Sequence, residues 1–198
     1  MRDNPRITGH ESGKPIISQN PSARLLEIIR AVSYLDNSYL TIQGPPGSGK
    51  TYTAKHVIAA LLKLGKKIGI SSNSHKAINH LLINTAEYCQ QEGINGYFAC
   101  TKNTDEILLK LGINVYKNED IVRSLQPSCV IGTTAWGFAR DDLENVFDYL
   151  FIDEAGQVSV ANLIAMSSST RNIVLMGDQM QLGQPSQGSH PENSGSSI

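Results

Sequence analysis

The sequence predicts an α/β fold in which a parallel sheet is flanked by helices. Short apolar segments alternate along the chain with longer segments that repeat apolar residues every three or four positions. Several short segments are apolar throughout, as expected of strands buried on both faces of a parallel sheet. The length of 198 residues suits one domain with its own hydrophobic core.

The expected elements begin with a helix over 22–35, with Asn20 as its cap and Pro21 at its first position. The expected strands are Tyr39–Gln43, Lys67–Ser71, Tyr97–Cys100, Cys129–Gly132, Tyr149–Ile152 and Asn172–Met176. The expected helices between them are Thr51–Leu64, Ala77–Tyr88, Asp105–Leu111, Glu119–Leu125 and Gln157–Met166. Strands and helices that alternate in this way indicate a parallel sheet covered on both faces.

The domain organisation follows from changes in composition. Residues 1–19 carry scattered prolines and glycines and are expected to form an N-terminal arm or linker. Residues 20–198 are expected to form one domain with a small insertion at about 90–126. Residues 183–198 have no periodicity and are rich in Gly, Ser and Pro.

Charge and cysteine content exclude several classes of function. The 17 basic and 18 acidic residues give a net charge of −1, which excludes binding of nucleic acid or anionic lipid through a broad basic field. Contacts to a nucleic-acid backbone through amides and hydroxyls remain possible. Cys89, Cys100 and Cys129 lack ligand spacing, so we expect free thiols in a reducing compartment. No signal peptide and no membrane span is visible, and we predict a cytoplasmic protein.

The strongest motif fits the phosphate-loop pattern G-x-x-x-x-G-K-[ST] and lies between an expected strand and an expected helix. Glycines let backbone N–H groups point inward at phosphate oxygens, and the start of the helix adds partial positive charge. Lys50 is expected to reach the β- and γ-phosphates, and the Thr51 hydroxyl to bind Mg²⁺. The alternative is a glycine-rich turn without a ligand. The motif comprises Gly44, Pro45, Pro46, Gly47, Ser48, Gly49, Lys50 and Thr51.

Two carboxylates directly after the expected strand 149–152 supply the second half of such a site. Asp153 is placed to hold Mg²⁺, and Glu154 to act as the base that orients an attacking water. The alternative is a pair of solvated carboxylates at the start of a helix. A third polar segment follows the last expected strand, and in it Gln181 is placed to reach the γ-phosphate.

Four stretches together resemble the first RecA-like domain of superfamily 1 helicases, in the subclass that includes the nonsense-mediated-decay helicases. They are QGPPGSGKT at 43–51, SNSHKAINHL at 72–81, DEAGQ at 153–157 and GDQMQLGQP at 177–185. Their order and spacing match the family over roughly residues 20–190. The phrases SNSHKAI and DEAGQVSVANLIAM look most like bacterial proteins that fuse a RecB-like nuclease to such a helicase.

The resemblance implies an ATP- and Mg²⁺-dependent motor that moves along single-stranded DNA or RNA, in the 5′ to 3′ direction. It assigns phosphate contacts to Gly47, Gly49 and Lys50, and magnesium ligation to Thr51 and Asp153. It assigns catalysis to Glu154 and Lys50, and coupling at the nucleotide to Gln157 and Gln181. Nucleic-acid contacts fall to Ser74, His75, Lys76 and Thr134.

Two of the neighbouring residues have ordinary structural explanations as well. His75 also fits as a polar residue at a helix start. Trp136 could stack on a base, but a tryptophan directly after a buried strand is more often core, and we predict a core position.

The sequence departs from the family pattern in two ways. The family's adenine-reading glutamine is replaced by Arg24 or Glu27, which puts adenine selectivity in question. A second RecA-like domain, which supplies catalytic arginines in this family, is absent, so we expect a fragment that binds Mg-nucleotide but hydrolyses it slowly.

Two other functions share the phosphate loop. A P-loop phosphotransferase needs an arginine-rich lid, yet only Arg140 and Arg171 follow Gly132. A nucleotide-gated module that recruits a partner nuclease would not need Glu154 as a base.

Overall fold

The computed structural model describes residues 4–103 and 105–178. In this part of the chain seven strands form one parallel sheet in the order β1-β7-β6-β2-β5-β3-β4. The strands are β1 (Tyr39–Gln43), β2 (Lys67–Ser71), β3 (Tyr97–Cys100), β4 (Asn114–Val115), β5 (Cys129–Gly132), β6 (Phe147–Ile152) and β7 (Thr170–Gly177). The α-helices are α1 (Arg24–Ser33), α2 (Lys50–Lys63), α3 (His75–Gln91), α4 (Ile107–Lys110), α5 (Ala135–Phe138) and α6 (Val160–Ser167). Short 3₁₀ helices are η1 (Asn118–Ser124), η2 (Asp141–Leu143) and η3 (Ala155–Gln157).

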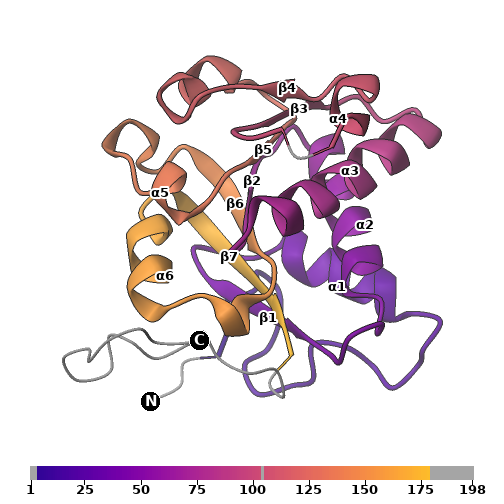
Figure 1. The fold of residues 1–198 in the computed structure, drawn as a ribbon. Coiled ribbons are helices and arrows are strands. Elements are labelled where there is room, and N and C mark those ends of the chain that lie inside the picture. Colours follow the sequence, from indigo (N-terminus) through magenta and orange to yellow (C-terminus); the bar gives the residue numbers. More distant parts are fainter. Residues whose placement is uncertain (1–3, 104, 179–198) are drawn as a thin grey trace.

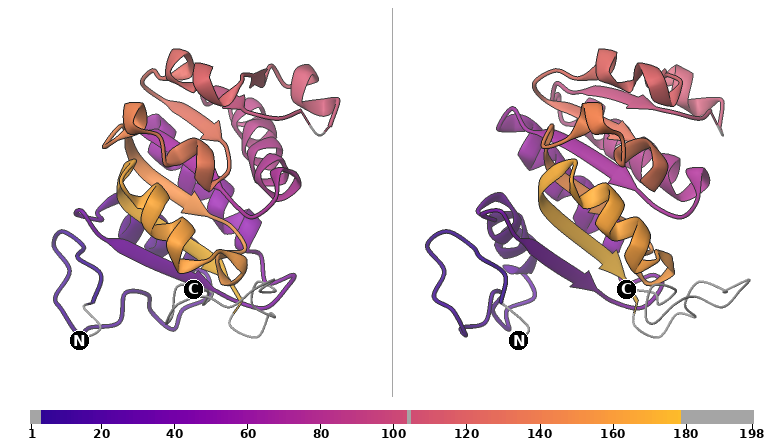
Figure 2. Two further views of the ribbon diagram at one scale, coloured as in Figure 1. Left: turned by 60° about the vertical axis from the view of Figure 1, so that its left-hand side comes forward. Right: turned by 90° about the vertical axis from the view of Figure 1, so that its left-hand side faces the viewer.

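Helices cover both faces of this sheet. Helices α1, α2 and α3 lie on one face and α5 and α6 on the other (Figures 1 and 2). Because every strand runs in the same direction, the carboxyl ends of all strands meet at one edge. Ligands of open α/β sheets bind at that edge. The parallel sheet with helices on both faces confirms the predicted fold class.

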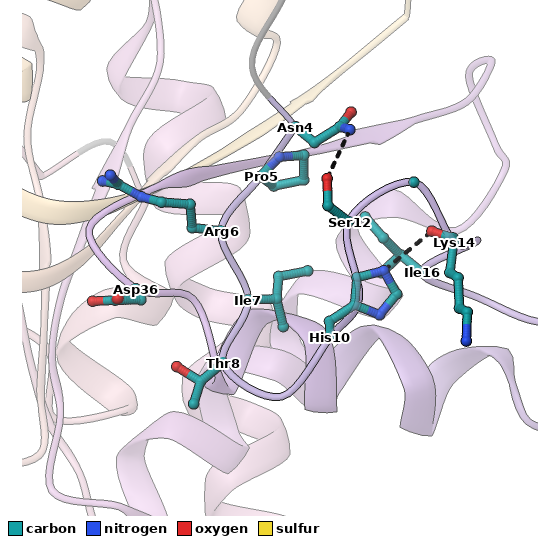
Figure 3. A pocket seen from close by; sticks show the side chains of 11 residues that line it. Asn4, Pro5, Arg6, Ile7, Thr8, His10, Ser12, Lys14, Ile16 and Asp36 are labelled. Atoms are coloured by element: carbon teal, nitrogen blue, oxygen red, sulfur yellow. Dashed lines mark hydrogen bonds between the residues drawn. The ribbon is translucent and has the colours of Figure 1, made fainter.

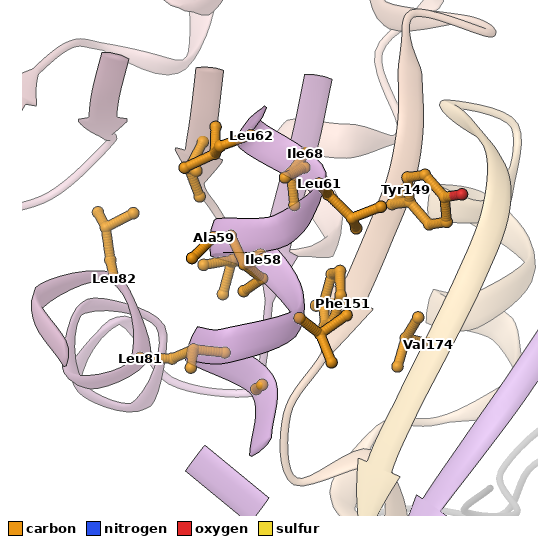
Figure 4. Packing of buried hydrophobic residues seen from close by; sticks show 14 of the residues in the cluster. Ile58, Ala59, Leu61, Leu62, Ile68, Leu81, Leu82, Tyr149, Phe151 and Val174 are labelled. Carbon is orange, nitrogen blue, oxygen red and sulfur yellow. The ribbon is translucent and has the colours of Figure 1, made fainter. Parts of the chain in front are cut away.

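The central strand β6 shows why its sequence is apolar throughout. Tyr149 and Phe151 belong to the core on the α2 side, where Leu61 of α2 points toward Tyr149 (Figure 4). Leu150 and Ile152 belong to the second core, under α5 and α6. Alternate residues of one strand thus fill two separate layers.

We expect Phe151→Ala to destabilise the domain by about 3–5 kcal/mol, because it removes a fully buried ring from the central strand. Urea denaturation followed by circular dichroism measures this change. Leu64→Ala is the matched control, since Leu64 is 59% exposed and its loss should change the free energy of unfolding by no more than about 0.5 kcal/mol. Equal midpoints for the two variants would contradict the assignment of Phe151 to the core.

Element boundaries differ from the predicted ones where capping decides them. Helix α3 begins at His75 because the Ser74 hydroxyl accepts a hydrogen bond from the Ala77 N–H at 3.1 Å. Helix α6 begins only at Val160, since the Ser159 hydroxyl caps it, and 155–157 form η3 instead. Asn20 makes a local turn rather than a helix cap, accepting a hydrogen bond from the Ser22 N–H.

Short elements account for the remaining differences. The helices expected at 105–111 and 119–125 are the single turn α4 and the 3₁₀ helix η1. The two-residue strand β4 and the single turn α5 have no counterpart among the expected elements. Both are too short to produce a periodic pattern.

The core position predicted for Trp136 is wrong, because its side chain is 80% exposed. The neighbouring residues Ala135, Gly137 and Phe138 of α5 are buried instead. A single helical turn that turns these positions inward leaves the remaining side chain outside.

Three further features complete the description of the fold. The arm packs along α1, where Ile7 forms an isolated antiparallel bridge to Leu35. All three cysteines are free and buried, and burial raises the pKa of each thiol, that of Cys89 to about 11. Within 4–103 and 105–178, none of the helices has the length and apolar character needed to cross a bilayer.

Candidate nucleotide-binding site

The phosphate loop connects the carboxyl end of β1 to the first residue of α2. Gly47 and Gly49 have backbone φ angles of 76° and 85°, which residues other than glycine rarely adopt. Gly49 is the residue before α2, so the backbone N–H groups of the first helical turn face the loop. A hydrogen bond of 3.1 Å from the Gly44 N–H to the Gly177 carbonyl fixes the loop to β7. The local sequence thus builds an anion-binding turn.

Lys50 folds back over this loop. Its Nζ donates hydrogen bonds to the carbonyl oxygens of Gly44, at 2.6 Å, and Pro45, at 3.0 Å. The ammonium group is therefore held inside the turn that the sequence assigns to phosphate. An anion placed in the turn would exchange these two neutral acceptors for charged ones, which bind an ammonium group more strongly.

The two predicted carboxylates lie at the carboxyl end of β6. The Asp153 N–H donates to the Ser71 carbonyl at 2.9 Å, and its Oδ1 accepts from the Glu154 N–H at 3.0 Å. Burial raises the pKa of Asp153, and the charges of Lys50 and His80 act in the opposite direction. Glu154 has a left-handed backbone, with φ 53°, which turns the chain sharply into η3.

One cavity of about 420 Å³ joins these elements. Its lining includes predicted residues from three motifs and also His80 and Gly177, for which the sequence predicts no individual role. His80 follows Lys76 by one turn of α3, so the helical repeat after the Ser74 cap could have indicated it. The lining residues are Pro46, Lys50, Thr51, Ser74, Lys76, Ala77, His80, Asp153, Glu154 and Gly177.

Backbone contacts tie the motifs together behind the cavity. The Asn73 side-chain amide donates to the Gln157 carbonyl, which joins the end of β2 to η3. A Cβ on Gly177 would lie 3.4 Å from the Gly156 nitrogen, so the end of β7 and η3 are in close contact. Gln157 is not among the residues that line the cavity. Gln181 lies outside the described residues.

The four residues assigned to nucleic acid lie at the carboxyl ends of β2 and β5. Ser74 and Lys76 line the cavity, and the Ser74 hydroxyl also caps α3. His75 is the first residue of α3, and its pKa is lowered by burial and by the Lys102 charge. Thr134 precedes α5 and does not line the cavity.

The donor groups in the cavity suit Mg²⁺. A threonine hydroxyl and an aspartate carboxylate are hard oxygen ligands of the kind that Mg²⁺ prefers. Among residues 4–103 and 105–178, the buried hydroxyls of Ser71 and Ser72 have no hydrogen-bond partner, and both residues lie at the end of the strand that pairs with β6 before Asp153. Neither hydroxyl lines the cavity, which offers Mg²⁺ the side-chain oxygens of Thr51, Asp153 and Glu154.

A second hollow, of about 380 Å³, lies under the N-terminal arm (Figure 3). Ten residues between Asn4 and Ile16 line it together with Asp36, and the His10 ring is hydrogen-bonded to the Lys14 carbonyl. Asp36 precedes β1, whereas the phosphate loop follows it. The hollow is therefore at the opposite edge of the sheet and is separate from the nucleotide site.

We expect Asp153→Asn to raise the melting temperature of the ligand-free chain at pH 7. A carboxyl group whose pKa is higher in the folded than in the unfolded state costs stability once the pH exceeds the unfolded pKa of about 4. The gain should therefore vanish as the pH falls below about 4. Thermal melts in EDTA at pH 7 and at a pH below about 4 measure this difference in melting temperature, with Asp141→Asn at an exposed position as control. A melting temperature at pH 7 that falls with Asp153→Asn would contradict the burial cost.

The parallel sheet, the glycine turn, Lys50 and the carboxylate pair define a P-loop nucleotide-binding protein with a RecA-like sheet. The chain belongs to the family described as AAA domain, whose family model matches residues 28–188. This match and the relatives below confirm the resemblance to superfamily 1 helicases.

Named relatives are much longer proteins. DNA replication ATP-dependent helicase/nuclease JHS1 of Arabidopsis thaliana is 34% identical over 146 residues, which cover 73% of this chain and 11% of that protein. DNA replication ATP-dependent helicase/nuclease DNA2 of Saccharomyces cerevisiae is 24% identical over 200 residues, covering 91% of this chain and 12% of that protein. Among solved structures, the arterivirus nonstructural protein 10 helicase has a TM-score of 0.46 at 17% identity, over 76% of this chain and 31% of that chain.

Proposed function

We propose that this chain is the ATP-binding and hydrolysing motor domain of a superfamily 1 helicase. The observation that carries the proposal is the cavity in which Lys50, Thr51, Asp153 and Glu154 meet. Two segments that lie about 100 residues apart in the sequence supply these four side chains. A glycine turn alone would bind an anion, whereas the added carboxylates serve hydrolysis.

Each side chain has a role that its position supports. Lys50 would leave the carbonyls of Gly44 and Pro45 and bind the β- and γ-phosphates of ATP. Thr51 and Asp153 would hold Mg²⁺, which when bound neutralises phosphate charge. Glu154 would orient a water and accept its proton. Gln157 and Gln181 remain proposed coupling residues.

The proposed track is single-stranded DNA or RNA, contacted by Ser74, His75, Lys76 and Thr134. The relatives' names specify a helicase/nuclease, which supports DNA. We propose that the whole protein also contains a nuclease domain and a second RecA-like domain. We further propose that it resembles the bacterial proteins in which a nuclease is fused to such a helicase. The proposed domain limits are 1–19 for the arm and 20–198 for the motor domain, with an insertion at about 90–126. The proposed location is the cytoplasm, which the three free thiols support.

Single-turnover hydrolysis of labelled ATP by this chain, with and without Mg²⁺ and single-stranded oligonucleotide, tests the proposal. We expect Mg²⁺-dependent binding of ATP and ADP, and slow release of phosphate that the oligonucleotide accelerates. Transfer of the label to a nucleoside monophosphate would instead indicate a phosphotransferase. Nucleotide binding with no hydrolysis above the protein-free rate would favour a nucleotide-gated binding module.

A further inference from the structure

Trp136 is the most exposed of the large apolar side chains in the described residues, at 80%. It is also the only tryptophan in the sequence. Exposing so large an apolar surface costs free energy in water, so the reason for its position lies either in its support or in a ligand.

The support holds the side chain outward. Phe138, two residues later, is fully buried and packs edge-on against Phe147 with ring centroids 5.2 Å apart. A Cβ on Gly137 would collide with the Thr133 side chain, so this position must be glycine for α5 to approach β5. The backbone on both sides of Trp136 is therefore fixed.

A chain of hydrogen bonds holds Thr133, the residue against which Gly137 packs. The Thr101 hydroxyl donates to the Thr133 hydroxyl at 2.9 Å, and the latter donates to Asn118 Oδ1 at 3.1 Å. Thr133 is completely buried. The indole is thus presented on a rigid element, which is how proteins hold aromatic rings for stacking.

The location indicates the ligand. Trp136 follows β5 at the carboxyl edge of the sheet, the edge that holds the phosphate loop. Lys102 follows the neighbouring strand β3, and Lys76 lies at the start of α3; both are exposed, and no ion pair of either is found among the described residues. An aromatic ring and free ammonium groups at one edge suit a ligand that has flat bases and phosphates.

A protein partner fits less well. A stable protein interface buries about 800 Å² on each side, whereas one tryptophan supplies roughly 150–250 Å². Ile164 of α6, the helix packed against α5, adds one more exposed apolar side chain. A single protruding ring matches one base better than it matches a protein surface.

We propose that Trp136 stacks on a base of single-stranded nucleic acid, with Lys102 close to the same path. The proposal rests on the proposed function, because it takes the track to be a single strand. It adds a contact to a base to the nucleic-acid contacts proposed for Ser74, His75, Lys76 and Thr134.

Because Trp136 is the single tryptophan of the sequence, the tryptophan fluorescence of the protein reports on its environment. Oligothymidylate added to the wild-type chain should quench the tryptophan emission along the same curve as the anisotropy of a fluorescein-labelled oligothymidylate. Trp136→Ala should raise the Kd from anisotropy about 5- to 150-fold, the range that corresponds to loss of one stacked base. Trp136→Phe keeps a ring and should raise it less, and Leu64→Ala, another exposed apolar residue, should leave it unchanged. Melting curves check that each variant folds.

Three results would overturn the inference. Saturating anisotropy with unchanged emission and an unchanged Kd for Trp136→Ala would place the strand elsewhere and leave the proposed function standing. Emission that depends on protein concentration without oligonucleotide would show that α5 contacts another protein copy. No binding of oligothymidylate, with or without Mg-ATP, would remove both this inference and the proposed nucleic-acid track, whereas ATP binding would still be measured separately.

Discussion

Replacing Lys50 by alanine is expected to weaken Mg-ATP binding by at least about 100-fold. A hydrogen bond from an ammonium group to a charged oxygen contributes about 1.5–3 kcal/mol, and the lysine is placed to make two. The variant also loses a positive charge that acts on Asp153, so the carboxylate would repel phosphate more strongly. Removing this single side chain therefore acts on attraction and repulsion together.

Calorimetric titration with Mg-ATP and Mg-ADP measures the effect. Lys63→Ala is the matched control, because it removes the same charge from the other end of α2, where the side chain is exposed. The control should bind like the wild type. If Lys50→Ala retained wild-type affinity, nucleotide would not occupy the turn between β1 and α2. If the wild-type chain bound no nucleotide, the ATP site itself would be refuted.

Glu154→Gln is expected to slow phosphate release about 100-fold or more while nucleotide affinity stays within a few-fold, since general-base catalysis contributes about 10²–10⁴ in rate. Glutamine has the shape of glutamate but cannot accept the proton of an attacking water. The left-handed backbone at this position applies equally to both residues, so the substitution changes chemistry more than structure.

Single-turnover assays at saturating Mg-ATP separate this effect from binding. Glu144→Gln is the control, because Glu144 is exposed and lies outside the cavity. A Glu154→Gln rate equal to that of the wild type would show that another group activates the water, or that the wild-type rate is not enzymatic. Lower affinity with an unchanged rate would assign Glu154 to binding instead.

Much of the fold could be predicted because its strands are buried on both faces. β1, β2, β3 and β5 have the predicted limits, since short apolar runs end where the sheet ends. The limits of α3 and α6 depend on serine caps, which one sequence offers in many places. The pattern of apolar residues along the chain does not show which of these serines caps a helix.

The same distinction applies to the site. The glycine turn and the carboxylates could be predicted from spacing, because phosphate and metal require those groups after a strand. The position of His80 could be predicted only in part: the helical repeat places it on the same side of α3 as Lys76, but its place in the cavity depends on how α3 crosses the sheet edge. Trp136 was misplaced because burial depends on which neighbours occupy the core, and the inward places of α5 belong to Ala135, Gly137 and Phe138.

The buried thiols make this chain a convenient host for site-specific labels. Thiolates, not thiols, react with maleimides, and Cys89, Cys100 and Cys129 combine burial with a raised pKa. A single cysteine introduced at an exposed position would therefore react well before any native one, without removing the others. Fluorescence or spin probes could then follow movements at the sheet edge in the otherwise unaltered domain.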